Sequence, residues 1–249
     1  ERLISEEGVS TIFGCWTSAC RRTVRPVIER LDHLLFYPLQ YEGLEVSENI
    51  VHLGATPNQQ IIPALKWAFG SHKKKFYLVG SDYVFPHVAH RIIRDFVERW
   101  RGEIVGEEYV LLQGEQDMSD VVDGIVAARP DVILNTINGD ANIAFFKALR
   151  DGGITPEDIP TISFSVTESE LKNMGATLLA GDYASWSYFQ SIPDEENRSF
   201  VSSYKKRMGG DSVLGDPMEA AYVGVYLWAR AVEAAGSSDV ADIRSNVGN

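Results

Sequence analysis

The chain has 249 residues, of which 45% are hydrophobic and 23% charged, as is ordinary for a globular protein with its own core. This length allows one large domain or two small ones, and no apolar stretch approaches the roughly 20 residues that would span a bilayer. With 23 Lys and Arg against 35 Asp and Glu, the net charge of −12 argues against nucleic-acid binding, since that affinity comes from basic residues on phosphates.

Short β-branched or aromatic segments alternate with longer helical patterns along the chain. Strands are expected at residues 10–15, 33–37, 50–54, 76–80, 131–136 and 160–164. Their continuous apolarity fits parallel strands covered on both faces, whereas residues 103–112 alternate in polarity and suit an edge strand. Helices are expected at residues 19–30, 58–69, 86–101, 118–128, 141–150, 194–208 and 216–235. This alternation predicts βαβ units and open parallel sheets.

Five strand-to-helix junctions are rich in hydroxyl, amide, acidic or aromatic side chains. Their sequences are CWTSA, YPLQYEG, GSDYVF, NTINGDAN and SFSVTES. Ligands of open parallel sheets bind beyond the carboxyl ends of the strands, which is where these junctions lie. Aromatic walls with a few polar groups are typical of an enclosed small-molecule site. Aromatic residues at or near strand ends are Trp16, Tyr37, Tyr41, Tyr83, Phe85, Tyr183, Trp186 and Tyr188.

Motifs for catalysis, metal binding and phosphate binding are missing from the sequence. Ser18 lacks both glycines of the G-x-S-x-G elbow, and no histidine lies at the other four junctions to take its proton. His87 and His90 share a helix face, but no acid completes a zinc motif, so a solvated face is favoured. Neither glycine-rich phosphate motif is present. We therefore expect no enzyme activity, no metal and no cofactor.

Three acidic residues lie at or near the junctions and leave two interpretations open. Asp82, Asp140 and Glu168 can accept hydrogen bonds from a ligand, or they can serve as helix N-caps. The two cysteines, Cys15 and Cys20, have no second pair or nearby His for zinc. Two small buried thiols are favoured over a disulfide for this pair.

Six sequence blocks, in order, resemble a known family. They are GCWTSACRRTVRPVIE, LLFYPLQYEGLE, GATPNQQIIPALKW, GSDYVFP, NTINGDANIAFF and DPMEAAYVGVYLWARAVEAAG. From about Ile12 to Gly236 the chain is similar to the urea and short-chain-amide binding proteins of the type I periplasmic-binding-protein superfamily. The resemblance implies an α/β fold of two Rossmann-like lobes with parallel sheets joined by a hinge, which close over a ligand.

The resemblance also implies how the chain is divided between the lobes. Lobe one would hold residues 1–55 and the return segment 183–249, and lobe two residues 56–182. Family members usually have a further βαβα unit before this point and a final return to lobe two after it. We therefore expect a chain truncated at both ends, with an incomplete first lobe.

In the family, loops of both lobes hold the ligand. The residues that match them here are Trp16, Thr17, Ser18, Tyr37, Leu39, Gln40 and Tyr41 in lobe one, and Tyr83, Phe85, Asp140, Ser165 and Glu168 in lobe two. Leu39 and Gln40 depart from the pattern, because some amide binders have a short hydroxyl residue in this loop.

The residue types at these positions suit a small uncharged amide. The Ser18 hydroxyl and the backbone N–H groups near Ala19 can donate to a carbonyl oxygen, while Asp140 or Glu168 can accept from amide N–H groups. Trp16, Tyr83 and Phe85 would exclude water. No Arg lies at the junctions to hold a ligand carboxylate in a bidentate pair, which argues against amino acids and carboxylates.

The sequence therefore predicts a solute-binding protein that captures urea or a short-chain amide between two lobes and presents it to the membrane permease of an ABC transporter. Such a protein would be periplasmic or extracellular. The alternative is an amide-sensing domain of a regulator or receptor, which in a regulator would be cytoplasmic. An enzyme that hydrolyses the amide is the least favoured hypothesis.

Overall fold

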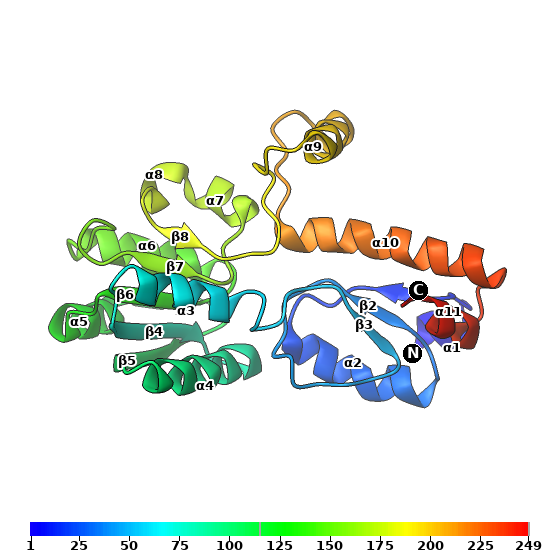
Figure 1. The fold of residues 1–249 in the computed structure, drawn as a ribbon, viewed down its shortest axis with the longest axis horizontal. Coiled ribbons are helices and arrows are strands. Elements are labelled where there is room, and N and C mark those ends of the chain that lie inside the picture. Colours follow the sequence, from blue (N-terminus) through cyan, green and yellow to red (C-terminus); the bar gives the residue numbers. More distant parts are fainter. Residues whose placement is uncertain (115, 249) are drawn as a thin grey trace. The chain divides into compact units, whose positions relative to one another are not determined.

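The computed structural model describes residues 1–114 and 116–248, which form two compact units. Unit 1 consists of Glu1–Thr56 and Asp216–Asn249, and unit 2 of Pro57–Gly215. Each unit contains a parallel sheet and helices, as Figure 1 shows. The expected α/β fold with parallel sheets is confirmed.

Unit 1 is built on a three-stranded parallel sheet of order β1-β2-β3. Its elements are α1 (Arg2–Ser5), β1 (Ile12–Phe13), α2 (Ser18–Arg30), β2 (Leu35–Tyr37), β3 (Ile50–His52), α10 (Asp216–Ala235) and α11 (Val240–Asn246). Because strand side chains alternate between faces, Leu35 and Tyr37 pack with Ile28 of α2, whereas Phe36 packs with Ala231 of α10 and with α11.

Unit 2 is built on a five-stranded parallel sheet of order β5-β4-β6-β7-β8. Its strands are β4 (Lys75–Ser81), β5 (Glu103–Val110), β6 (Val132–Thr136), β7 (Thr161–Ser163) and β8 (Tyr183–Ala184). Its helices are α3 (Ile61–Gly70), α4 (Val84–Arg99), α5 (Ser119–Ala128), α6 (Ala141–Asp151), α7 (Glu168–Met174), α8 (Ala176–Leu179) and α9 (Glu195–Met208). The expected edge strand is confirmed as β5.

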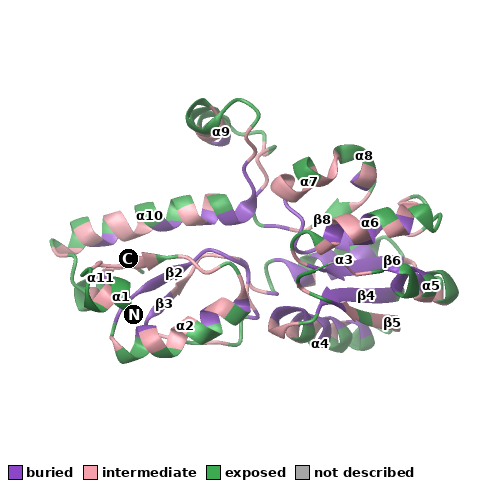
Figure 2. Ribbon diagram, turned by 180° about the vertical axis from the view of Figure 1, so that it is seen from behind, coloured by how far each residue is buried: buried purple, intermediate pink, exposed green. Residues whose placement is uncertain are grey.

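Two hydrophobic cores cover the faces of the unit 2 sheet. Helices α3 and α4 pack on the face that presents Phe76 and Leu78, and α5 and α6 on the face that presents Tyr77 and Val79. Strands β4 and β6 are therefore buried along most of their length (Figure 2). Within the described residues, no helix has the length and apolar character needed to cross a membrane.

The chain leaves unit 2 later than the expected boundary at residue 183. Strand β8 pairs with β7 in the unit 2 sheet, and Phe189 bridges to Gly215. The Tyr188 hydroxyl donates to Asn197 Oδ1 at 2.7 Å, which ties the segment before α9 to that helix. These contacts keep residues 183–215 in unit 2.

The expectation of a solvated face for both His87 and His90 is wrong for His90. His90 is completely buried, with Nδ1 3.1 Å from Glu107 Oε1 and Nε2 2.8 Å from Thr136 Oγ1. His87 is exposed and lies 2.7 Å from Asp82. Helix α4 also buries Pro86, Ala89, Ile93 and Val97, so His90 lies on the core face of this helix.

Cys15 and Cys20 form a disulfide, with Cα atoms 5.6 Å apart, so the expectation of two free thiols is wrong. The bridge closes the loop that leads from β1 into α2. The turn over Trp16 and Thr17 brings the two cysteines into bonding distance, and the C-x4-C spacing alone does not reveal that turn.

Replacing both cysteines by serine is expected to destabilise unit 1 by about 2 kcal/mol. A bridge over about six residues removes that much loop-closure free energy from the unfolded chain. Urea unfolding with and without reducing agent measures the effect. The wild type should lose stability on reduction and the double variant should not respond; equal midpoints in all four samples would contradict a formed bridge.

Candidate functional site

The disulfide holds a loop that presents Trp16 at the amino end of α2. Trp16 is 58% exposed, whereas Ser18 is only 2% exposed. Thr17 is the N-cap of α2, since its hydroxyl oxygen accepts from the Cys20 backbone N–H at 3.1 Å. The cap and the bridge together fix the loop, with an aromatic ring facing outward and the Ser18 hydroxyl directed inward.

Directly behind Ser18 lies a buried ion cluster centred on Arg21, whose side chain is completely buried. Arg21 Nη1 donates to Ser18 Oγ at 3.2 Å, and Nη2 donates to Glu42 Oε2 at 2.7 Å. Nε and Nη2 donate to the two carboxylate oxygens of Glu45 at 3.3 and 3.2 Å. Four of the five guanidinium N–H groups are thus used, which satisfies the charge of Arg21 inside the protein.

Three aromatic rings surround the same cluster. The Arg21 guanidinium carbon lies 4.8 Å from the ring centroid of Tyr37 and 5.4 Å from that of Tyr41, within range of cation–π attraction. The His52 ring stacks on Tyr41 with centroids 3.8 Å apart. Burial raises the pKa of Tyr37 to about 12, against the opposing effect of the Arg21 charge, so the Tyr37 hydroxyl stays protonated at neutral pH.

Several polar atoms of this cluster are buried without a hydrogen-bond partner in the described part of the chain. They are Glu42 Oε1 and both ring nitrogens of His52. Leaving a buried donor or acceptor unpaired costs about 1–3 kcal/mol each, so such atoms call for an explanation. A bound small polar molecule would supply one.

His52 is expected to make unit 1 less stable as the pH falls from about 6.5 to 4. Burial, helped by the Arg21 charge, lowers the pKa of His52 to about 4, so the unfolded chain binds the proton first. The loss should reach about 1–2 kcal/mol after allowance for partial solvent screening and level off below pH 4. His52→Phe keeps the stack on Tyr41 and should remove this loss.

Urea midpoints measured across this pH range test the expectation, with the exposed His72→Asn as a matched control. The wild type and His72→Asn should lose stability in parallel while His52→Phe stays flatter. Three parallel curves would show that His52 is not the group responsible.

Leu39 and Gln40 lie in the loop after β2 and are both buried. Their backbone passes directly over Gly54, where an added Cβ would come within 2.0 Å of the Leu39 carbonyl carbon and oxygen. The backbone N–H of Tyr41 donates to the Ala55 carbonyl at 3.1 Å. Close approach to the segment after β3 therefore fixes the position of this loop.

In unit 2, Tyr83 and Asp140 lie at the amino ends of two helices, and Phe85 lies in the first turn of α4. Tyr83 is the N-cap residue of α4 and is half-buried. Asp140 is exposed at the N-cap position of α6 but makes no side-chain capping hydrogen bond. Phe85 is 2% exposed in the core under α3 and α4, so its role as part of a ligand wall has less physical support than that of Tyr83.

Ser165 and Glu168 follow β7, and Glu168 lines a cavity of about 250 Å³ within unit 2. Glu168 Oε1 accepts from the Gln190 backbone N–H at 2.8 Å, whereas Oε2 is buried without a partner among the described residues. Burial, together with repulsion from Glu170, raises the pKa of Glu168. Leu171, Leu179 and Phe189 supply much of the apolar lining. This cavity fits a small molecule that offers an N–H donor on a partly apolar body.

The N-capping interpretation of the three acids holds only for the position of Asp140, which is the N-cap residue of α6. Thr167 is the cap of α7, and its capping box uses Glu170, not Glu168. Asp82 pairs with His87, and Asp140 makes no capping bond. Capping therefore does not account for any of the three carboxylates.

Each unit brings part of the predicted set together. In unit 1, Ser18, Tyr37 and Tyr41 surround Arg21 at the carboxyl end of the sheet. In unit 2, Tyr83, Asp140, Ser165 and Glu168 follow the carboxyl ends of β4, β6 and β7. The sequence analysis missed Arg21, Glu42, Glu45 and His52. The signal for Arg21 was its spacing of three residues from Ser18, which places both side chains on one face of the helix.

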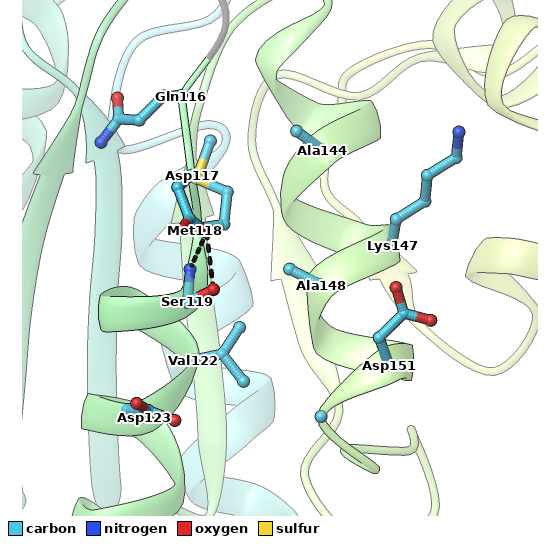
Figure 3. Close-up of a pocket in the computed structure, with 11 residues that line it drawn as sticks. Gln116, Asp117, Met118, Ser119, Val122, Asp123, Ala144, Lys147, Ala148 and Asp151 are labelled. Atoms are coloured by element: carbon cyan, nitrogen blue, oxygen red, sulfur yellow. Dashed lines mark hydrogen bonds between the residues drawn. The ribbon is translucent and has the colours of Figure 1, made fainter.

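A second hollow of about 470 Å³ lies between α5 and α6 and contains none of the predicted residues. As Figure 3 shows, Val122 points from α5 toward α6, and Lys147 and Asp151 extend from α6. Ala144, Ala148 and Gly152 leave the space open because their side chains are small. Among all the residues that the structure describes, no group of three or more His, Cys, Asp or Glu is placed to hold a metal ion.

Two α/β units with parallel sheets and polar loops at the strand ends define the class of two-unit ligand-binding folds. Residues 1–249 match the periplasmic binding protein domain, and the chain therefore belongs to this family.

The individual proteins that the chain resembles have low sequence identity to it. The chain is 24% identical over 241 residues to a Leu/Ile/Val-binding protein homolog of Brucella melitensis, covering 95% of this chain and 61% of that protein. The chain thus spans less than two thirds of the length of the curated relatives it matches.

Solved structures share the fold. A solute-binding protein of an ABC transporter from R. palustris, in complex with 4-hydroxybenzoate, has a TM-score of 0.88 at 24% identity, covering 98% of this chain and 68% of that one. A leucine-binding protein from Thermotoga maritima has a TM-score of 0.82 at 20% identity, covering 99% and 70%. At these identities the similarity establishes the fold alone.

Proposed function

We propose that this chain is the ligand-binding part of a solute-binding protein that captures urea or a short-chain amide for the membrane permease of an ABC transporter. The observation that carries this proposal is the gathering of polar and aromatic residues at the carboxyl ends of the parallel strands in each unit of a periplasmic binding protein domain.

Each unit offers groups that suit one part of an amide. Unit 1 offers hydroxyl donors at Ser18 and Tyr37, which suit a carbonyl oxygen. Unit 2 offers carboxylate oxygens at Glu168 and Asp140, which suit amide N–H groups. Among these four residues no nucleophile lies next to a base, so we propose no catalytic role.

The disulfide favours the transport role over a cytoplasmic regulator. Disulfides persist in oxidising compartments such as the periplasm and are rare in the cytosol, and Cys15 and Cys20 are bonded. We therefore propose a periplasmic or extracellular location, with the amide sensor as the second candidate in the form of a receptor ectodomain.

Urea is the smallest candidate ligand, and its size limits how tightly it can bind. It has four heavy atoms, and at a ceiling near −1.5 kcal/mol per atom its Kd would be on the order of tens of micromolar. Structural relatives in complex with 4-hydroxybenzoate, or named for leucine, make carboxylates the ligands to compare with it.

Isothermal titration of the full chain with urea, acetamide, leucine, glutamate and 4-hydroxybenzoate tests the proposal. Heat of binding with urea or acetamide, and none with the three carboxylates, is the expected result. Tight binding of leucine or 4-hydroxybenzoate without any response to amides would refute the amide assignment. An ammonia-release assay with acetamide should show no turnover.

A further inference from the structure

The buried cluster behind Ser18, a predicted ligand contact, pairs the positive charge of Arg21 with the negative charges of two glutamates. Arg21 donates to Ser18 Oγ at 3.2 Å, which places its positive charge directly behind this predicted contact. Alone, it would attract a ligand carboxylate, because guanidinium pairs strongly with carboxylates. In this protein, the carboxylates that pair with Arg21 are those of Glu42 and Glu45.

The surrounding charges make the cluster slightly negative. Arg25 Nη1 lies 3.8 Å from Glu45, and Arg25 Nε lies 2.7 Å from Glu29. Two cations, Arg21 and Arg25, thus face three carboxylates, which leaves one net negative charge at neutral pH. Because Arg21, Glu42 and Glu45 are largely buried, solvent and salt screen this charge only weakly.

We propose that the Arg21–Glu42–Glu45 cluster is a specificity device that orients the Ser18 hydroxyl while making unit 1 select uncharged ligands over carboxylates. Arg21 donates to Ser18 Oγ, so the single hydroxyl hydrogen of Ser18 can be donated to a ligand oxygen. The two glutamates cancel the positive charge that a ligand carboxylate would otherwise meet. The inference rests on the proposed function, since it concerns the same ligand.

Near-isosteric pairs of ligands isolate the effect of charge. Acetamide and acetate, and benzamide and benzoate, differ in one unit of charge at pH 7 and little in shape. The wild type should bind each amide at least tenfold more tightly than its acid. Glu42→Gln removes one negative charge from the cluster and should shift the ratio of the two affinities about tenfold toward the acid.

Isothermal titration of the full chain with these four probes, at low and high salt, measures the ratio. Glu45→Gln is a second variant, should Glu42→Gln fail to fold, and is expected to shift the ratio in the same direction. Glu48→Gln removes the same charge from an exposed position close in sequence and should change the ratio less than twofold. A merely structural role for the cluster would alter both affinities together and leave their ratio unchanged.

The outcomes separate the inference from the proposed function. If the probes bind but the ratio in Glu42→Gln and Glu45→Gln equals that in Glu48→Gln, the specificity role is overturned and the binding function stands. Tighter binding of acids than of amides by the wild type also overturns the role. If none of the four probes binds the wild type, the proposed amide function fails and the inference fails with it.

Discussion

Gly54→Ala is expected to unfold unit 1 or leave it at least about 3 kcal/mol less stable. The new Cβ would lie 2.0 Å from the Leu39 carbonyl carbon and oxygen and 2.4 Å from the Gln40 backbone nitrogen. These are backbone atoms of a buried loop, so no side chain can rotate away, and overpacking of this kind belongs to the severe mechanisms of destabilisation. Ligand binding should disappear with the displaced loop.

Gly14→Ala is the matched control, because nothing lies within 4 Å of its added Cβ in the same unit. Circular dichroism and urea unfolding of the two variants beside the wild type provide the comparison. Gly14→Ala should behave like the wild type. A Gly54→Ala variant of normal stability would mean that the loop carrying Leu39 and Gln40 does not pack on Gly54 in solution.

Glu168→Gln is expected to weaken acetamide binding ten- to hundredfold without unfolding unit 2. The buried Oε2 atom is the acceptor that we assign to an amide N–H, and hydrogen bonds to charged groups contribute about 1.5–3 kcal/mol. The raised pKa of Glu168 shows that burial disfavours its charged form, so removing that charge should cost the folded protein little.

Glu157→Gln, which removes an exposed carboxylate from the same unit, is the control for this prediction. Titration calorimetry of both variants with acetamide gives the ratio of affinities, and thermal unfolding checks that both are folded. Equal affinities in the two variants would remove Glu168 from the site. A parallel loss in Ser18→Ala would show that both units contribute to binding.

The regular elements were predictable because their signals are local. Continuous apolar runs such as residues 76–80 gave β4 to within one residue at either end, and helix α10 has the expected bounds. The short helices α1, α7, α8 and α11 and the strand β8 were missed, since so few residues carry too little periodicity. Strand β8 exists because it pairs with β7, a contact that no pattern within the segment indicates.

The candidate ligand-binding residues were partly predictable, but the buried residues that hold them in place were not. Junction position and residue type point to Ser18 and Glu168. Arg21, by contrast, owes its role to Glu42 and Glu45, which lie 21 and 24 residues further along the chain. His90 of α4 likewise has its partners, Glu107 and Thr136, on the strands β5 and β6. Such partners are set by tertiary packing, which spacing in a sequence does not reveal.

A crystal structure of the full chain grown with acetamide tests the central claim most directly. The account predicts an acetamide whose carbonyl oxygen lies within about 3.2 Å of the Ser18 hydroxyl. Acetamide found only in the hollow between α5 and α6, or bound without contact to Ser18, would contradict it.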